Sequence, residues 1–148
     1  MLGLQFIGVA APRPRRPRVL VAEDHPLLRR AIRVALERDG YDVLEAGNGL
    51  ELVDRLQETM VAGEPAPDLV LSDQGLPLAT GLEVLGRLRE AQWPLPFVLM
   101  LDGPVDGRLE ADAYRLGARA VLAKPFGLEQ LRATVRAALA LPAEEVTA

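Results

Sequence analysis

Three short apolar runs that each end in a charged residue constrain the fold of this chain most. The clearest run, Leu69–Leu71, leads to Asp73 and then to a turn that contains Gly75 and Pro77. An apolar run of this length between turn signals predicts a strand that is buried on both faces. A buried parallel strand presents its last residue at the carboxyl edge of its sheet, where ligands bind in open α/β folds. We therefore expect Asp73 to lie in a functional site.

The other two runs bring further charges to the same predicted edge. Val19–Ala22 precedes the acid pair Glu23 and Asp24, and Val121–Ala123 precedes Lys124. Ligand sites in open parallel sheets form where several strands end together. The acid pair, Asp73 and the lysine are thus expected to share one pocket.

Strand and helix patterns alternate along the rest of the chain. The predicted strands are 19–22, 41–46, 69–73, 97–101 and 120–123. Helical patterns, with apolar residues three and four positions apart, follow from Pro26 to Gly40 and over 50–61, 81–91, 106–116 and 128–141. Five strand–helix units with short connections predict an α/β fold, in which a doubly wound parallel sheet lies between two layers of helices.

Length and composition bound the domain organisation. The 148 residues suit one domain, which we place at 18–141, after an N-terminal arm or linker at 1–17 and before a short tail at 142–148. The arm is uncharged up to Ala11 and then alternates proline with arginine, a composition typical of an extended linker. The sequence has no apolar run long enough to cross a bilayer.

Composition also argues against several classes of site. The chain has no cysteine and one histidine, His25, so disulfides, cysteine-ligated metals and histidine-based catalytic sites are excluded or disfavoured. The net charge of −4 gives no general reason to expect direct binding to nucleic acid. A flavodoxin-like small-molecule binder is disfavoured, because no glycine-rich phosphate loop follows the first strand.

The combined motifs resemble the receiver domain of bacterial two-component response regulators. The resemblance rests on residues 19–26, 68–73, 117–118 and 124–126, with Pro77 and Gly81 between the second and third of these, and it extends over 18–141. Each motif is weak alone, but their order and their places at strand ends are specific. The resemblance implies a flavodoxin-like (βα)5 sandwich with strand order 2-1-3-4-5.

The resemblance also assigns roles to the charged residues. It implies that Asp73 is the phosphoacceptor and that Lys124 contacts the phosphoryl group. Glu23 and Asp24 would hold Mg²⁺, directly or through water, together with Asp73 and the carbonyl group of Gly75. The ligand atoms agree with a magnesium site, because crowded carboxylates need a cation and a set of oxygen ligands alone favours a hard ion.

Each of these residues also has an ordinary structural explanation. Asp73 could cap the helix that follows it, Glu23 and Asp24 could form a solvated turn, and Lys124 could be a surface lysine. The Lys124–Pro125 peptide bond, which the resemblance implies to be cis, would be a further sign of the receiver geometry.

Two positions depart from the receiver pattern. Asp102 stands where receivers usually carry the Thr or Ser of the activation switch, and Val121 stands where they usually carry an aromatic residue. An ionised aspartate cannot donate a hydrogen bond and would repel a phosphoryl group. Asp102 therefore either faces the pocket and pairs with Lys124, or turns outward, because Asp-Gly-Pro sequences often form turns.

The sequence leaves two functional hypotheses. The first is a cytoplasmic receiver that accepts a phosphoryl group on Asp73 from a histidine kinase or a histidine phosphotransfer protein. It would catalyse only its own phosphorylation and dephosphorylation, and would signal by contact with a downstream protein, possible homodimers included, without direct nucleic-acid or membrane binding. The second is a degenerate receiver that binds a protein partner independently of phosphorylation.

Overall fold

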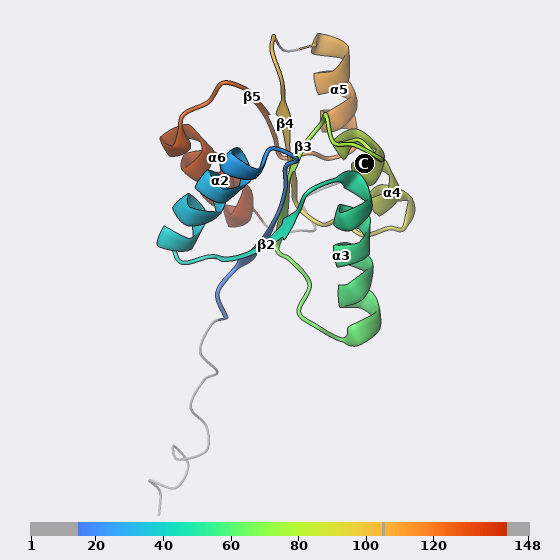
Figure 1. Cartoon of the computed structure of the whole chain (residues 1–148). Helices are drawn as coiled ribbons and strands as arrows, with labels where there is room; N and C mark the ends of the chain where they lie inside the picture. Colours follow the sequence, from blue (N-terminus) through green and yellow to red (C-terminus); the bar gives the residue numbers. More distant parts are fainter. Residues whose placement is uncertain (1–14, 105, 142–148) are drawn as a thin grey trace, which may run out of the picture.

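The computed structural model describes residues 15–104 and 106–141 (Figure 1). Most of the predicted arm, residues 1–14, and the predicted tail, residues 142–148, lie outside the described residues. The described strands are β1 (Arg18–Ala22), β2 (Asp42–Ala46), β3 (Leu69–Asp73), β4 (Phe97–Leu101) and β5 (Ala120–Ala123). The helices that follow them are α2 (Pro26–Arg38), α3 (Gly49–Ala62), α4 (Gly81–Glu90), α5 (Gly107–Arg115) and α6 (Leu128–Ala140).

All strand pairs are parallel, and the order across the sheet is β2-β1-β3-β4-β5. This order confirms the fold that the sequence predicts. In Figure 1, α2 and α6 cover one face of the sheet, and α3, α4 and α5 cover the other. The chain is thus a doubly wound three-layer sandwich.

The sheet separates two hydrophobic clusters, because successive side chains of a strand point to opposite faces. On β3, Leu69 and Leu71 pack with residues of α2 and α6, whereas Val70 packs with residues of α3 and α4. Every residue of β3 and β4 is buried. Burial on both faces explains why these strands read as continuous apolar runs instead of alternating ones.

Polar side chains that accept hydrogen bonds from backbone N–H groups fix where several helices begin. The Nδ1 atom of His25 accepts a hydrogen bond from Leu28 N–H at 3.3 Å, which caps α2. Thr80 and Glu83 form a reciprocal capping box at the start of α4. Asp106, predicted as the first residue of a helix, instead caps α5 by accepting a hydrogen bond from Arg108 N–H at 2.9 Å.

The strand register brings the ends of four strands to one edge. The paired residues nearest that edge are Ala22 and Ser72, Asp73 and Met100, and Leu101 and Ala123. The residues at or just beyond these pairs are Glu23, Asp73, Asp102 and Lys124. The fold therefore places them side by side, although they are distant in the sequence.

The start of α4 packs directly against the end of β3, and only glycine fits there. A methyl group on Gly81 would lie 2.7 Å from the Asp73 carbonyl oxygen and 2.7 Å from Leu99 Cδ1. Later in the same helix, a methyl group on Gly86 would meet nothing within 4 Å.

We expect opposite effects from two glycine-to-alanine changes in α4. Gly81→Ala should lower the free energy of unfolding by about 1–3 kcal/mol, because the methyl group overpacks a rigid contact. Gly86→Ala should raise it by about 0.5–1 kcal/mol, because alanine loses less backbone entropy in a helix. Urea denaturation of both variants checks this. Equal shifts for the two variants would show that the contact at Gly81 is not tight.

Candidate functional site

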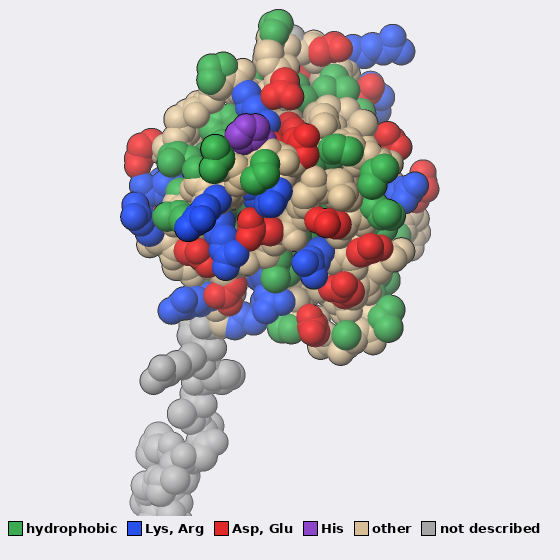
Figure 2. All heavy atoms as spheres, viewed as in Figure 1, with side chains coloured by type: hydrophobic (Ala, Val, Ile, Leu, Met, Phe, Trp, Pro, Cys, Tyr) green, Lys and Arg blue, Asp and Glu red, His purple; other side chains and the backbone are tan. Residues whose placement is uncertain are grey.

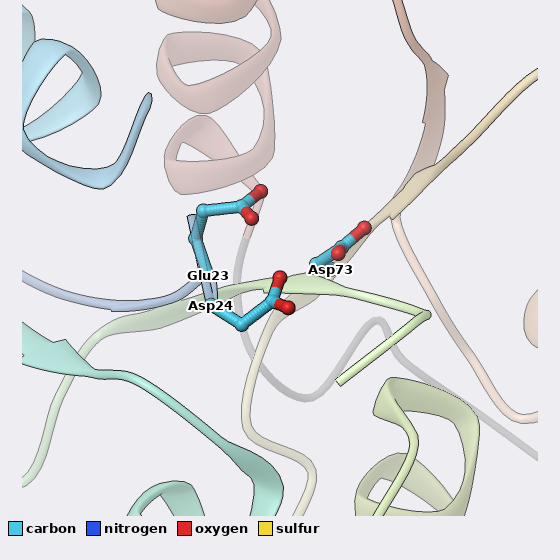
Figure 3. Close-up of side chains that lie close together, drawn as sticks. All are labelled: Glu23, Asp24 and Asp73. Atoms are coloured by element: carbon cyan, nitrogen blue, oxygen red, sulfur yellow. The ribbon is translucent and has the colours of Figure 1, made fainter. Parts of the chain in front are cut away.

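Three carboxylates from two strand ends meet at the carboxyl edge of the sheet. Glu23 and Asp24 follow β1, and Asp73 ends β3. Each of the three offers an oxygen atom within 4.8 Å of the others. Figure 3 shows the three side chains close together, with Glu23 and Asp24 extending toward the side on which Asp73 lies. Glu23 and Asp73 are only 0% and 1% exposed, whereas Asp24 is exposed. The predicted acidic pocket is thus present, with two of its acids buried.

Lys124, the only lysine of the chain, provides the positive charge of the site. Its Nζ atom donates a hydrogen bond to Glu23 Oε1 at 2.7 Å and lies 3.3 Å from Asp73 Oδ1. The Lys124–Pro125 peptide bond is cis, as the resemblance implies. The ordinary surface role for Lys124 is therefore wrong, because its side chain is only 16% exposed and faces two buried carboxylates.

Both carboxylate oxygens of Glu23 are already engaged. Its Oε1 accepts from Lys124, and its Oε2 accepts a hydrogen bond from His25 N–H at 3.0 Å. Arg29 Nη1 donates to the Glu23 carbonyl oxygen at 2.8 Å and fixes the backbone at the end of β1. These contacts of His25 and Arg29 could not be predicted from the sequence, since neither a turn residue nor a residue on a helix surface carries a signal for them.

Asp73, in contrast, has an unsatisfied oxygen. Its Oδ1 atom is buried and has no hydrogen-bond partner among the described residues, although Lys124 lies at ion-pair distance. Unpaired buried carboxylate oxygens are unfavourable, and such an atom in a native structure often marks a site for an ion or a reaction. The helix-capping role for Asp73 is wrong, because Thr80 caps α4.

The site opens to solvent through a hollow of about 460 Å³. The acidic residues, Lys124 and Gly75 line it together. A methyl group on Gly75 would lie 3.8 Å from Asp73 Oδ2, so this glycine leaves the approach to Asp73 unobstructed. In Figure 2, the single histidine lies next to acidic side chains, and basic and acidic side chains are interspersed across the visible face.

Burial and neighbouring charges shift the pKa values of the two central groups. Burial, together with the charges of Glu23 and Asp102, raises the pKa of Asp73 from 3.8 to about 6, although Lys124 opposes the change. Burial lowers the pKa of Lys124, but the hydrogen bond to Glu23 and the nearby carboxylates outweigh it and raise that pKa above 10.5. The lysine therefore stays charged, while ionised Asp73 is unfavourable unless more positive charge is present.

Of the two residues that depart from the receiver pattern, Asp102 directly follows β4 at this edge, and Val121 lies within β5. Asp102 faces the pocket, with Oδ1 3.5 Å from Lys124 Nζ, while its side chain remains 70% exposed. Val121 is partly buried and packs against the core. The hydroxyl oxygen of Tyr114, from α5, accepts a hydrogen bond from Val121 N–H at 3.2 Å. An aromatic side chain of the neighbouring helix thus lies against β5, a placement that spacing in the sequence does not reveal.

The donor set fits a hard divalent cation. The cluster offers carboxylate oxygens only, one of its acids is exposed, and a buried oxygen of Asp73 has no hydrogen-bond partner among the described residues. These features suit Mg²⁺, which prefers one or two carboxylates and keeps several waters.

Residues 19–136 match the sequence profile of the response regulator receiver domain. This chain belongs to the response regulator receiver domain family. The receiver domain is 36% identical over 121 residues to the transcriptional regulatory protein KdpE of Mycobacterium tuberculosis, a match that covers 82% of this chain and 50% of KdpE. The KDP operon transcriptional regulatory protein KdpE of Escherichia coli is 38% identical over 122 residues, with 82% and 50% covered. This chain therefore spans about half the length of these curated relatives.

Solved receiver structures share the fold. The non-phosphorylated HemR receiver domain of Leptospira biflexa superposes with a TM-score of 0.75 at 25% identity, over 86% of this chain and 97% of that one. The chemotaxis response regulator CheY4 of Vibrio cholerae gives a TM-score of 0.71 at 24% identity, over 84% and 99% of the two chains. Within the described part of the receiver, no helix has the length and apolarity needed to span a membrane.

The raised pKa of Asp73 predicts a pH-dependent stabilisation by Asp73→Asn. The native carboxyl group ionises near pH 6 and the unfolded one near 3.8, so the parent loses stability as the pH rises between these values. In metal-free buffer at pH 8, the variant should exceed the parent in free energy of unfolding by about 1–3 kcal/mol. The gain should shrink as the pH falls through about 6 and disappear only below the unfolded pKa of 3.8, by about pH 2.5, where both states of the parent are protonated.

Urea denaturation at a series of pH values measures this difference. Asp54→Asn, at an exposed position of α3, is the matched control and should show no such pH-dependent gain. A constant difference between Asp73→Asn and the parent from acid to alkaline pH would contradict the predicted strain on the Asp73 carboxylate.

Proposed function

We propose that this receiver domain acts in two-component signalling by accepting a phosphoryl group on Asp73. The donor is a histidine kinase or a histidine phosphotransfer protein. The observation that carries the proposal is the buried, unsatisfied Oδ1 atom of Asp73, which lies 3.3 Å from the only lysine of the chain and beside an acid pair suited to a divalent cation. Residues 18–141 form the proposed receiver unit.

The proposed reaction transfers a phosphoryl group from an oxygen or nitrogen atom of the donor molecule to the carboxylate of Asp73. An Asp73 carboxylate oxygen attacks phosphorus while the bond from phosphorus to the donor atom breaks. With acetyl phosphate as donor, acetate leaves with the bonding electron pair, and an aspartyl phosphate forms without net proton transfer. Lys124 holds an outer phosphoryl oxygen as a point charge. The chain catalyses only this transfer and the hydrolysis of its product.

Asp24 and Asp73 would hold Mg²⁺ directly, together with the carbonyl oxygen of Gly75. Glu23 would act through water, because Lys124 and His25 already engage both of its carboxylate oxygens. When bound, the ion supplies positive charge that offsets the charge of the transferring oxygens. This charge also favours the ionised form of Asp73, which the protein alone disfavours.

The proposed output is a protein contact on the surface formed by α5, β5 and α6. These elements follow β4 in the chain, and Asp102 and Lys124 lie in the segments that join them. The KdpE relatives are named as transcriptional regulators and are about twice as long as the matched region. For this chain, we propose a downstream protein as the direct partner.

Asp102 and Val121 support a second candidate function. Because the usual Thr or Ser and the usual aromatic residue are absent, the domain could recognise a partner without phosphorylation, as a degenerate receiver. The buried geometry of Glu23, Asp73 and Lys124 favours the phosphoacceptor instead.

Phosphorylation of Asp73 is testable with the isolated chain. Incubation with acetyl phosphate and Mg²⁺ should add one phosphoryl group, detected by intact mass. Asp73→Asn should remain unlabelled, and removal of Mg²⁺ with a chelator should reduce labelling of the parent at least about tenfold. Absence of label on a chain that also fails to bind Mg²⁺ would support the degenerate receiver.

The two acids after β1 should contribute unequally to metal affinity. Asp24→Asn should weaken Mg²⁺ binding by about tenfold or more, because it removes a free carboxylate ligand. Glu23→Gln should weaken binding less, because both Glu23 oxygens already accept hydrogen bonds from the protein. Isothermal titration calorimetry compares the two variants, and a larger loss for Glu23→Gln would contradict this division of roles.

A further inference from the structure

Asp102 lies on the solvent side of the proposed phosphoacceptor. Its Oδ1 atom is 3.5 Å from Lys124 Nζ. A methyl group on Gly75 would lie 3.6 Å from Asp102 Oδ2 and 3.8 Å from Asp73 Oδ2, so both carboxylates face the space above Gly75. Asp73 is 1% exposed and the Asp102 side chain 70% exposed, and both line the same hollow. Asp102 thus occupies the open end of the site.

Lys124 already has three carboxylate neighbours for the three N–H groups of its ammonium. The Nζ atom lies 2.7 Å from Glu23, 3.3 Å from Asp73 and 3.5 Å from Asp102. An outer oxygen of a phosphoryl group on Asp73 must replace one of these neighbours. Glu23 is fully buried and closest, and Asp73 is itself the acceptor. Asp102 is the most distant and most exposed partner, so it is the one that can leave.

We propose that Asp102 competes with the phosphoryl group for Lys124, so that the Asp102–Lys124 ion pair and phosphorylation of Asp73 exclude each other. This inference rests on the proposed function. A phosphoryl group carries nearly two negative charges at neutral pH, and a carboxylate that stayed beside Lys124 would repel it. Asp102 therefore opposes phosphorylation and determines how readily this receiver is labelled.

Asp102 acts here as a competing anion and not as a metal ligand. The oxygen cluster within 4.8 Å consists of Glu23, Asp24 and Asp73, and Asp102 is not a member. Its charge still favours a nearby cation through space, so neutralising Asp102 weakens Mg²⁺ binding slightly while it speeds labelling. Opposite directions of these two effects distinguish competition for Lys124 from a loss of metal binding.

The test compares Asp102→Asn with the control Asp54→Asn, which removes the same charge from an exposed position of α3. The first readout is the initial rate of Asp73 labelling by acetyl phosphate at saturating Mg²⁺. The second is the side-chain ammonium resonance of protein grown with isotope-labelled lysine, measured without Mg²⁺ or phosphate. Lys124 is the only lysine, so that resonance reports on this residue alone.

We expect Asp102→Asn to shift the Lys124 ammonium resonance and to raise the labelling rate by about three- to tenfold, because a largely exposed ion pair is weak. Asp54→Asn should change neither readout. An unchanged resonance in Asp102→Asn would overturn the proposed pairing, and a labelling rate equal to or below that of the parent would overturn the competition. Failure to label the parent, Asp102→Asn and Asp54→Asn alike would overturn the proposed function itself, and labelling of Asp102→Asn alone would support the competition strongly.

Discussion

The structure of this site depends on two buried carboxylates that share one ammonium group. Glu23 and Asp73 are almost fully removed from water, and both lie within 3.3 Å of Lys124. Burying a charge is costly unless it is paired, and one lysine cannot neutralise two carboxylates with Asp24 and Asp102 nearby. Burial and the excess of negative charge together raise the pKa of Asp73, and its Oδ1 atom has no hydrogen-bond partner in the part of the chain that the structure describes. The same imbalance makes the site suited to a cation, which the proposed phosphoryl transfer to Asp73 requires.

The parallel sheet makes this unfavourable arrangement possible. Glu23 and Lys124 are 101 residues apart, yet the order β2-β1-β3-β4-β5 brings the ends of their strands to the same edge. Apolar clusters on both faces of the sheet hold the strands in register. Their burial outweighs the local repulsion, since hydrophobic burial is the dominant favourable term in folding. The electrostatic repulsion at this edge is thus offset by hydrophobic packing elsewhere in the domain.

The two departures from the receiver pattern lie on or beside the strands β4 and β5. Asp102 replaces a hydroxyl donor with an anion beside Lys124, and Val121 replaces an aromatic ring on β5. Tyr114 of α5 places its own ring near that strand and accepts a hydrogen bond from the Val121 backbone. The receiver therefore has the acidic pocket and the lysine that the resemblance implies, together with two residues that differ from the receiver pattern.

The sequence by itself determined the fold class, the order of the elements and the identity of the charged residues at the strand ends. Strands such as β3 could be predicted because their apolar runs, here Leu69–Leu71, are visible in the local sequence. Tertiary structure alone decided which groups pair. Spacing along the chain could not indicate that Lys124 bonds Glu23 most closely, that Asp102 turns inward or that His25 engages Glu23. Those contacts arise from strand register and from side-chain orientations that packing fixes, across distances that no local pattern records.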